Sequence, residues 1–257
     1  NLISNENLLS LSGTIHGNSA TTSGTDNVWS VTYTLVDTDN EIVNIPFSLT
    51  LTDLAGNQTT LDQTNTTDSS SIIFDKTNPG VTSLVIISDN TDATRAKVGD
   101  IITISLTSNE NLLTLTGTIH GNTITATGSE TVWNATYTLK DTDSETAIIP
   151  FSLTMTDLVG NQTNIDNNDI TNGSVINFDK TNPTVTVLSI VSNNEDPTRA
   201  EIGDTITVNL TSDENLLSLS GTIYGSTITA TGAETAWNAT YTLLDTDNDI
   251  AIIPFSL

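Results

Sequence analysis

The chain contains no cysteine, few basic residues, few aromatic residues and no long apolar run. Without cysteine it forms neither disulfides nor thiolate metal sites. Six Lys and Arg stand against 31 Asp and Glu, which gives a formal net charge of −25. Such a charge repels nucleic acid and anionic membrane surfaces and attracts divalent cations. No apolar run reaches the roughly 18 residues of a membrane span. We therefore expect no nucleic-acid partner and no membrane insertion in this segment.

The most informative feature of the sequence is an internal repeat. The segment SNENLLSLSGTIHGN begins at Ser4 and returns in closely similar form at Ser108 and Ser212, each time 104 positions further on. The motif FDKTNP occurs at Phe74 and again at Phe178, with the same offset. Solenoid turns and propeller blades repeat every 20–50 residues or so, which is too short for this period. The period suits one small autonomous domain.

Proline marks the expected domain boundaries. Pro79 and Pro183 follow Thr-Asn at equivalent positions, and proline restricts the preceding residue and interrupts strand pairing. The sequence thus predicts a first repeat (1–78), a middle repeat (79–182) and a third repeat (183–257). Both chain ends fall inside a repeat pattern, so we expect a section of a longer array. The linkers lack a Gly/Ser spacer, which predicts direct contact between neighbouring repeats.

The pattern within each repeat is all-β. Thr, Ile and Val alternate with period two in short segments separated by Gly, Asn and Asp clusters. In the middle repeat the expected strands are 81–87, 101–107, 113–119, 123–127, 133–139, 147–155 and 175–178. About seven short strands in some 100 residues are typical of an immunoglobulin-like β-sandwich. We expect such domains to be joined end to end as a rod.

Four motifs resemble a known family. They are AKVGDIITISLTSNE (Ala96–Glu110), WNATYTL (Trp133–Leu139), FSLTMTDLVGN (Phe151–Asn161) and FDKTNPTVT (Phe178–Thr186). Together they resemble the tandem bacterial immunoglobulin-like repeats of giant surface adhesins, and are similar to the calcium-dependent extender repeats of RTX-type adhesins. The resemblance implies a spacer between a membrane anchor and a distal binding region, on a secreted chain at the bacterial cell surface.

Acidic turns supply the candidate metal ligands. Because strands of a sandwich reverse direction, the turns at the end of one repeat meet those at the start of the next. Several carboxylates at one junction would suit Ca²⁺, which takes six to eight oxygen ligands and tolerates irregular geometry. The candidate ligands at the two junctions are Asp37, Asp39, Asp75, Glu110, Asp141, Asp143, Asp179 and Glu214.

A structural interpretation of the same residues stays open. Asp, Asn and Thr are ordinary turn residues, because their side chains bond nearby backbone groups. No EF-hand loop is complete here. His16 and His120 sit in a turn where the third repeat has Tyr224, which argues against a catalytic or metal-binding histidine. The sequence offers no nucleophile with a base and no His/Cys cluster, so we expect no enzyme.

Three functional hypotheses remain. The first is a structural extender, whose partners are neighbouring repeats of the same chain. The second is a set of repeats that bind polysaccharide, ice or a neighbouring cell directly. The third is lateral assembly with other copies into a surface fibril. Residues 61–71 and 165–175 differ between repeats while the turns at the ends mostly agree, which favours the extender.

Overall fold

The computed structural model describes residues 1–257 and is all-β, with several small antiparallel sheets. Two short 3₁₀ turns are its helical elements, η1 (Gln63–Asn65) and η2 (Asn167–Asp169). No helix is long and apolar enough to cross a membrane. The chain divides into two compact units, Asn1–Asp179 and Lys180–Leu257. Each unit is described by itself.

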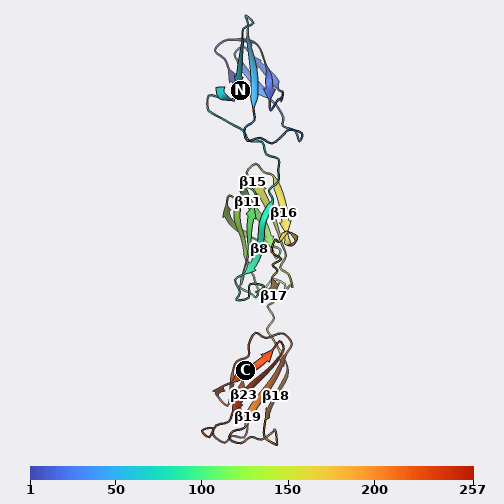
Figure 1. Ribbon diagram of the computed structural model, residues 1–257, viewed down its shortest axis with the longest axis vertical. Helices are drawn as coiled ribbons and strands as arrows, with labels where there is room; N and C mark the ends of the chain where they lie inside the picture. The colour runs from blue at the N-terminus through green and yellow to red at the C-terminus, as the bar shows by residue number, and fades with distance from the viewer. The chain divides into compact units, whose positions relative to one another are not determined.

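The middle repeat is built from two four-stranded sheets and one short parallel pair (Figure 1). Its strands are β8 (Val81–Ser88), β9 (Arg95–Ala96), β10 (Ile101–Ser108), β11 (Leu112–Ile119), β12 (Asn122–Thr123), β13 (Thr125–Ser129), β14 (Val132–Thr138), β15 (Phe151–Asp157), β16 (Gln162–Asp166) and β17 (Asn177–Phe178). One sheet has the order β13-β14-β10-β8 and the other β12-β11-β15-β16, while β17 pairs with β9 in parallel.

The inner faces of these two sheets share one hydrophobic core. Along β10, Ile102, Ile104 and Leu106 are buried, and the residues between them are more exposed. The strand β15 contributes Leu153 and Met155 from the opposite sheet to the same core. Burial of large side chains is the main favourable term in folding. The period-two pattern of the sequence therefore places one face of each sheet in the core and the other face toward solvent, as expected.

The first repeat has the same two-layer pattern with fewer buried residues. Its strands are β1 (Leu2–Ile3), β2 (Leu8–Ile15), β3 (Asn18–Ser19), β4 (Thr21–Thr25), β5 (Val28–Thr32), β6 (Phe47–Asp53) and β7 (Gln58–Asp62). They form the sheets β1-β5-β4 and β3-β2-β6-β7. The second unit contains β18 (Val185–Ser192), β19 (Thr205–Ser212), β20 (Thr222–Ile223), β21 (Ser226–Thr227), β22 (Thr229–Ala233), β23 (Ala236–Thr242) and β24 (Phe255–Ser256). These form the sheets β18-β19-β23-β22 and β21-β20-β24.

Most expected strands of the middle repeat are present, and several details differ. The single strand expected over 123–127 is two strands, β12 and β13, which belong to different sheets. The short strand β9 was not expected. The strand expected over 147–155 begins only at Phe151, because Pro150 has no N–H to donate and the preceding residues bond the end of the repeat instead. The strand expected over 175–178 is confined to β17. The strand β16 was not among the expected strands. Its sequence, QTNID, buries only Ile165, so it carries little apolar signal.

A segment near the end of the middle repeat covers the edge strand β8. The backbone N–H of Leu84 donates to Thr171 Oγ1, and the N–H of Thr171 donates to the Leu84 carbonyl, both at 3.0 Å. Ile170 and Ile176 pack on the same core. As a result Leu84 is 0% exposed, whereas Leu188, at the equivalent position of β18, is 48% exposed.

This contrast gives a matched pair of substitutions. We expect Leu84→Ala to destabilise the middle repeat by about 2–5 kcal/mol, because it leaves a cavity in a closed core. Leu188→Ala should cost less than about 1 kcal/mol, because that side chain already meets solvent. Urea unfolding followed by tryptophan fluorescence measures both changes. Equal losses for the two variants would contradict the assigned burial.

Candidate acidic junction site

Asp39 and Asp143 serve inside their own turns. The Asp39 carboxylate accepts hydrogen bonds from the Tyr33 hydroxyl at 2.9 Å, the Val36 N–H at 2.9 Å and Asn18 Nδ2 at 3.0 Å. Asp143 is placed in the same way, and Tyr137 donates to it at 2.8 Å. The carboxylate partner and burial raise the pKa of Tyr137 to about 12, with burial the larger cause. Both aspartates are buried, and their hydrogen bonds fix the two turns that follow Tyr33 and Tyr137.

The neighbours of these two aspartates are exposed. Asp37 and Asp141 lie at the surface of the same turns. The backbone carbonyls of Asp37 and Asp39 accept hydrogen bonds from Lys76 Nζ at 2.6 and 2.9 Å. This turn therefore meets the linker through carbonyl oxygens and a lysine. Its carboxylates do not belong to the acidic cluster at this junction, which is formed by other residues.

Three carboxylates meet where the first repeat leads into the middle repeat. Asp75 follows Phe74, which bridges to Ile42 in the first repeat. Glu110 lies in the turn between β10 and β11, and Asp157 ends β15. One ligand atom from each of the three lies within 4.8 Å of the others, and Asp157 is buried while the other two are half-buried. The cluster could hold a metal ion, and its donors are all oxygen.

The turn after β15 holds Asp157 firmly. Its Oδ1 accepts backbone hydrogen bonds from Val159, Gly160 and Asn161 at 2.9, 2.7 and 2.9 Å. Its Oδ2 accepts one bond, from Asn161 Nδ2 at 2.8 Å. A carboxylate oxygen has two lone pairs, so Oδ2 keeps acceptor capacity for a cation.

Asn161 also ties this turn to the linker. Its Nδ2 donates to the carbonyls of Asp75 at 3.4 Å and Thr77 at 3.2 Å. From the first repeat, the Glu41 carboxylate accepts hydrogen bonds from the Lys76 N–H at 2.9 Å and from the Thr77 hydroxyl at 2.5 Å. Residues of both repeats thus fix the backbone on which Asp75 sits.

The electrostatics of the cluster are unfavourable as long as all three groups are charged. The pKa of Glu110 is raised by burial, and further by the negative charges of Asp75, Asp157 and Glu41. Burial also acts to raise the pKa of Asp157, but the hydrogen bonds from Asn161, Val159 and Gly160 hold it below its ordinary value. Two unit charges about 4 Å apart repel by roughly 4 kcal/mol at an effective dielectric constant of 20. A divalent cation bound between the carboxylates would replace this net repulsion by a net attraction.

The sequence identified two members of this cluster and missed the third. Asp75 and Glu110 were expected as ligands, and the structure brings them together. Asp157 was not among the expected ligands. A signal for it existed: Asp53 holds the same position in the first repeat, and it accepts bonds from Ala55 and Asn57 in the same kind of turn. The sequence analysis also did not predict that Glu41 lies near this cluster, where its charge helps to raise the pKa of Glu110.

A metal site at the second junction, with Asp179 and Glu214 as ligands, stays a prediction. Asp179 ends the first unit and Glu214 lies in the second unit, both half-buried. They are the counterparts of Asp75 and Glu110 one period later. In the second unit Asp213 accepts hydrogen bonds from the Thr184 N–H and hydroxyl at 2.7 Å. The equivalent Asn109 accepts from the Gly80 N–H at 2.7 Å, so this position serves the local turn in both repeats.

Comparisons with known proteins leave the family open. No family model matches the chain. No curated protein matches it. Among solved structures, the chain is similar to SGBP-B of the Bacteroides ovatus mixed-linkage glucan utilization locus, determined in complex with a mixed-linkage heptasaccharide. The identity is 16%, the match covers 93% of this chain and 52% of that chain, and the TM-score is 0.20. This chain thus spans about half of that structure, and at this TM-score the likeness carries no argument.

The raised pKa of Glu110 predicts a pH dependence. A carboxyl group whose pKa is raised on folding contributes stability below its ordinary pKa, and this contribution is lost as the pH rises through the raised value. In the presence of chelator we therefore expect Glu110→Gln to melt at a higher temperature than the parent at pH 7. The difference should vanish near pH 4. Calorimetry at both pH values measures it.

Asp157→Asn is the control with the opposite sign. The lowered pKa of Asp157 means that its carboxylate contributes stability above its ordinary pKa, and that this is lost on acidification. This variant should melt at a lower temperature than the parent at pH 7. If Glu110→Gln also lowered the melting temperature at pH 7, the repulsion inferred for the cluster would be wrong.

Proposed function

We propose that the chain is a run of structural spacer domains from a secreted bacterial surface protein, in which calcium stiffens the connection between repeats. The observation that carries the proposal is the meeting of Asp75 from the linker with Glu110 and Asp157 of the next repeat. A site that takes its ligands from two successive repeats couples their orientation. Its role is then mechanical, and the partners of each repeat are its neighbours in the chain.

The donor set favours calcium among the common cations. All three groups are carboxylates, which are hard oxygen ligands, and neither cysteine nor histidine belongs to the cluster. Zinc sites usually include such nitrogen or sulfur ligands. Magnesium demands near-ideal octahedral geometry, whereas calcium accepts six to eight oxygens in irregular arrangements. Water would complete the coordination, because three carboxylates do not supply that many ligands.

Several features support a spacer role. The sequence repeats with a constant period, and the structure has several small antiparallel sheets of the kind expected from tandem β-domains. In this proposal each repeat is an immunoglobulin-like sandwich, and the repeats follow one another end to end. The residues offer no nucleophile–base pair, and the chain acts by holding a distal binding region away from the cell surface. The large negative charge keeps such a long chain soluble.

Calcium binding can be measured directly on the 257-residue chain. We expect calcium to raise the melting temperature of the first unit. At a free concentration 100 times the dissociation constant the gain is about 2.7 kcal/mol, or roughly 5–11 °C for a unit of the size of Asn1–Asp179. The double variant Asp75→Asn/Glu110→Gln should lose this gain. Asp68→Asn/Glu195→Gln makes the same change in charge at exposed positions and should keep it.

A distance measurement tests stiffening separately from stability. Because the chain has no cysteine, the exposed residues Thr60 and Thr114 can be replaced by cysteine and spin-labelled without interference. We expect calcium to narrow the distribution of distances between the two labels. An increase in melting temperature with an unchanged distribution would leave a calcium site but refute the mechanical role. No change in either quantity would refute both.

A further inference from the structure

The loop over residues 171–174 of the middle repeat holds the edge strand β8. The Thr171 hydroxyl accepts a hydrogen bond from the Leu84 N–H at 3.0 Å, and the Ser174 hydroxyl accepts one from the Ile86 N–H at 3.1 Å. The Thr171 N–H returns a bond to the Leu84 carbonyl at 3.0 Å. These groups replace the neighbouring strand that the outer edge of β8 lacks, and cover of this kind keeps an edge strand from pairing elsewhere.

Asn172 and Gly173 form the turn between the two hydroxyl-bearing residues. The side-chain oxygen Oδ1 of Asn172 accepts a hydrogen bond from the Ser174 N–H at 3.0 Å, and Gly173 has a φ of 70°. This hydrogen bond closes a ring of atoms that includes the Gly173 nitrogen, so it holds the side-chain amide carbon of Asn172 over the same stretch of backbone. Both turn residues are exposed. The turn thus sets the position of Ser174 and leaves its own amide open to water.

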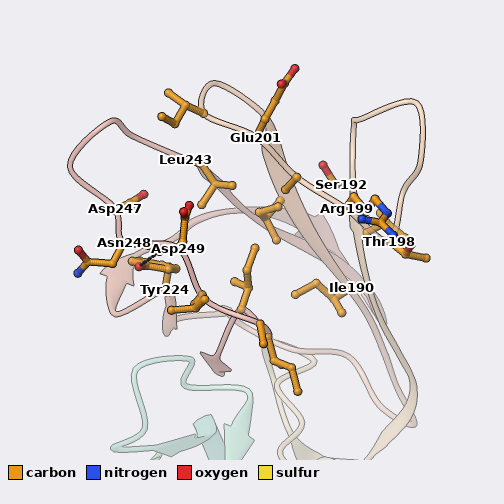
Figure 2. A pocket seen from close by; sticks show the side chains of 18 of the residues that line it. Ile190, Ser192, Thr198, Arg199, Glu201, Tyr224, Leu243, Asp247, Asn248 and Asp249 are labelled. Atoms are coloured by element: carbon orange, nitrogen blue, oxygen red, sulfur yellow. Dashed lines mark hydrogen bonds between the residues drawn. The ribbon is translucent and has the colours of Figure 1, made fainter.

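The second unit shows the equivalent strand without such a cover, because the counterpart of the covering segment (170–178) lies beyond Leu257. Ile190, the counterpart of Ile86, is 40% exposed, whereas Ile86 is 1% exposed. Figure 2 shows Ile190 and Leu243 at this open place, among the residues that line a cavity. The covering segment is therefore what keeps the apolar residues of β8 out of water in the middle repeat.

The turn contains the one Asn-Gly pair of the sequence. Because glycine has no Cβ, its nitrogen is unshielded and can reach the amide carbon of the preceding asparagine. The Gly173 nitrogen bonds to Cγ of Asn172, the bond from Cγ to Nδ2 breaks, and the Nδ2 group leaves as ammonia with the proton of the Gly173 N–H. The Ser174 N–H already donates to the oxygen that gains negative charge during this attack, and a preorganised donor of this kind lowers the barrier.

Water completes the reaction by opening the cyclic imide at either of its two carbonyls. Opening at the backbone carbonyl gives isoaspartate, whose main chain runs through Cβ and Cγ and is longer by one carbon. Opening at the side-chain carbonyl gives ordinary aspartate, which keeps the normal main chain. The two products carry the same charge, so they differ in backbone length alone.

The first repeat has an aspartate at the equivalent position. Asp68 stands one period before Asn172, and its Oδ1 accepts the same hydrogen bond, from the Ser70 N–H at 3.0 Å. Ser69, at the place of Gly173, has a φ of 56°. The turn therefore keeps its form with aspartate at its first position and serine at its second. Ordinary aspartate fits this turn, whereas the longer main chain of isoaspartate does not.

We propose that Asn172 and Gly173 form a self-modification site, at which spontaneous deamidation to isoaspartate releases part of the loop from β8. The reaction needs only water and hydroxide ion, with no metal and no partner, so it is independent of the proposed function. The longer main chain shifts Ser174 away from β8, and the Ile86 N–H loses its acceptor. Thr171 precedes the modified residue and keeps its bonds to Leu84.

Ageing of the full chain in mildly alkaline buffer with chelator tests the proposal. Labelling by isoaspartyl methyltransferase, followed by peptide mass spectrometry, locates and counts isoaspartate. We expect it to form at Asn172 at least about 10-fold faster than at the other asparagines, because none of them precedes glycine. Hydrogen exchange of the aged chain should then be at least about 10-fold faster at the Ile86 amide, through local opening, and unchanged at the Leu84 amide.

Two variants copied from the first repeat separate the chemistry from its effect. Gly173→Ser should form little isoaspartate and keep the Ile86 amide protected throughout ageing, and a Cβ at Gly173 meets no atom within 4 Å. Asn172→Asp should show the exchange rates of the unaged parent before any incubation, because the added charge alone leaves the turn intact.

Three results would overturn the proposal. The first is isoaspartate that forms at Asn172 no faster than elsewhere in the chain. The second is isoaspartate at Asn172 with unchanged exchange of the Ile86 amide, which would show that the modification leaves the loop in place. The third is a Gly173→Ser chain whose Ile86 amide loses protection on ageing as in the parent, which would give the opening another cause.

Discussion

The burial of one face of each thin sheet against the other is the interaction on which this structure depends. The strands are short and alternate between apolar and polar residues, so a single sheet would leave its apolar face in water. In the middle repeat the two sheets and the segment over β8 enclose one core. With no disulfide to help, this burial supplies the main driving force for folding.

Because the core fixes the strands, the turns between them are free to carry polar chemistry. The turn after β15 places Asp157 beside Glu110, although the residues are distant in sequence. Like charges held together in this way oppose folding until a cation or a proton joins them. The stability of this cluster therefore depends on the ionic conditions around the protein.

A short added strand closes the end of the middle repeat. The middle repeat shows how the two open edges are satisfied, by a segment with two apolar anchors. Ile176 and Phe178 of this segment are each 1% exposed and belong to the core. The residues that end the middle repeat therefore also complete its core.

The sequence by itself determined the all-β class, the repeat and most strands of the middle repeat, because period-two alternation is a local property. It missed β16, an edge strand whose residues QTNID bury only Ile165. Only the tertiary structure decided which carboxylates meet. Asp39 and Asp143 are held by the hydroxyls of Tyr33 and Tyr137 inside their own turns, whereas Asp157 reaches Asp75 and Glu110. Turn aspartates look alike in sequence, and their roles depend on the donors and charges that the packed sheets bring beside them.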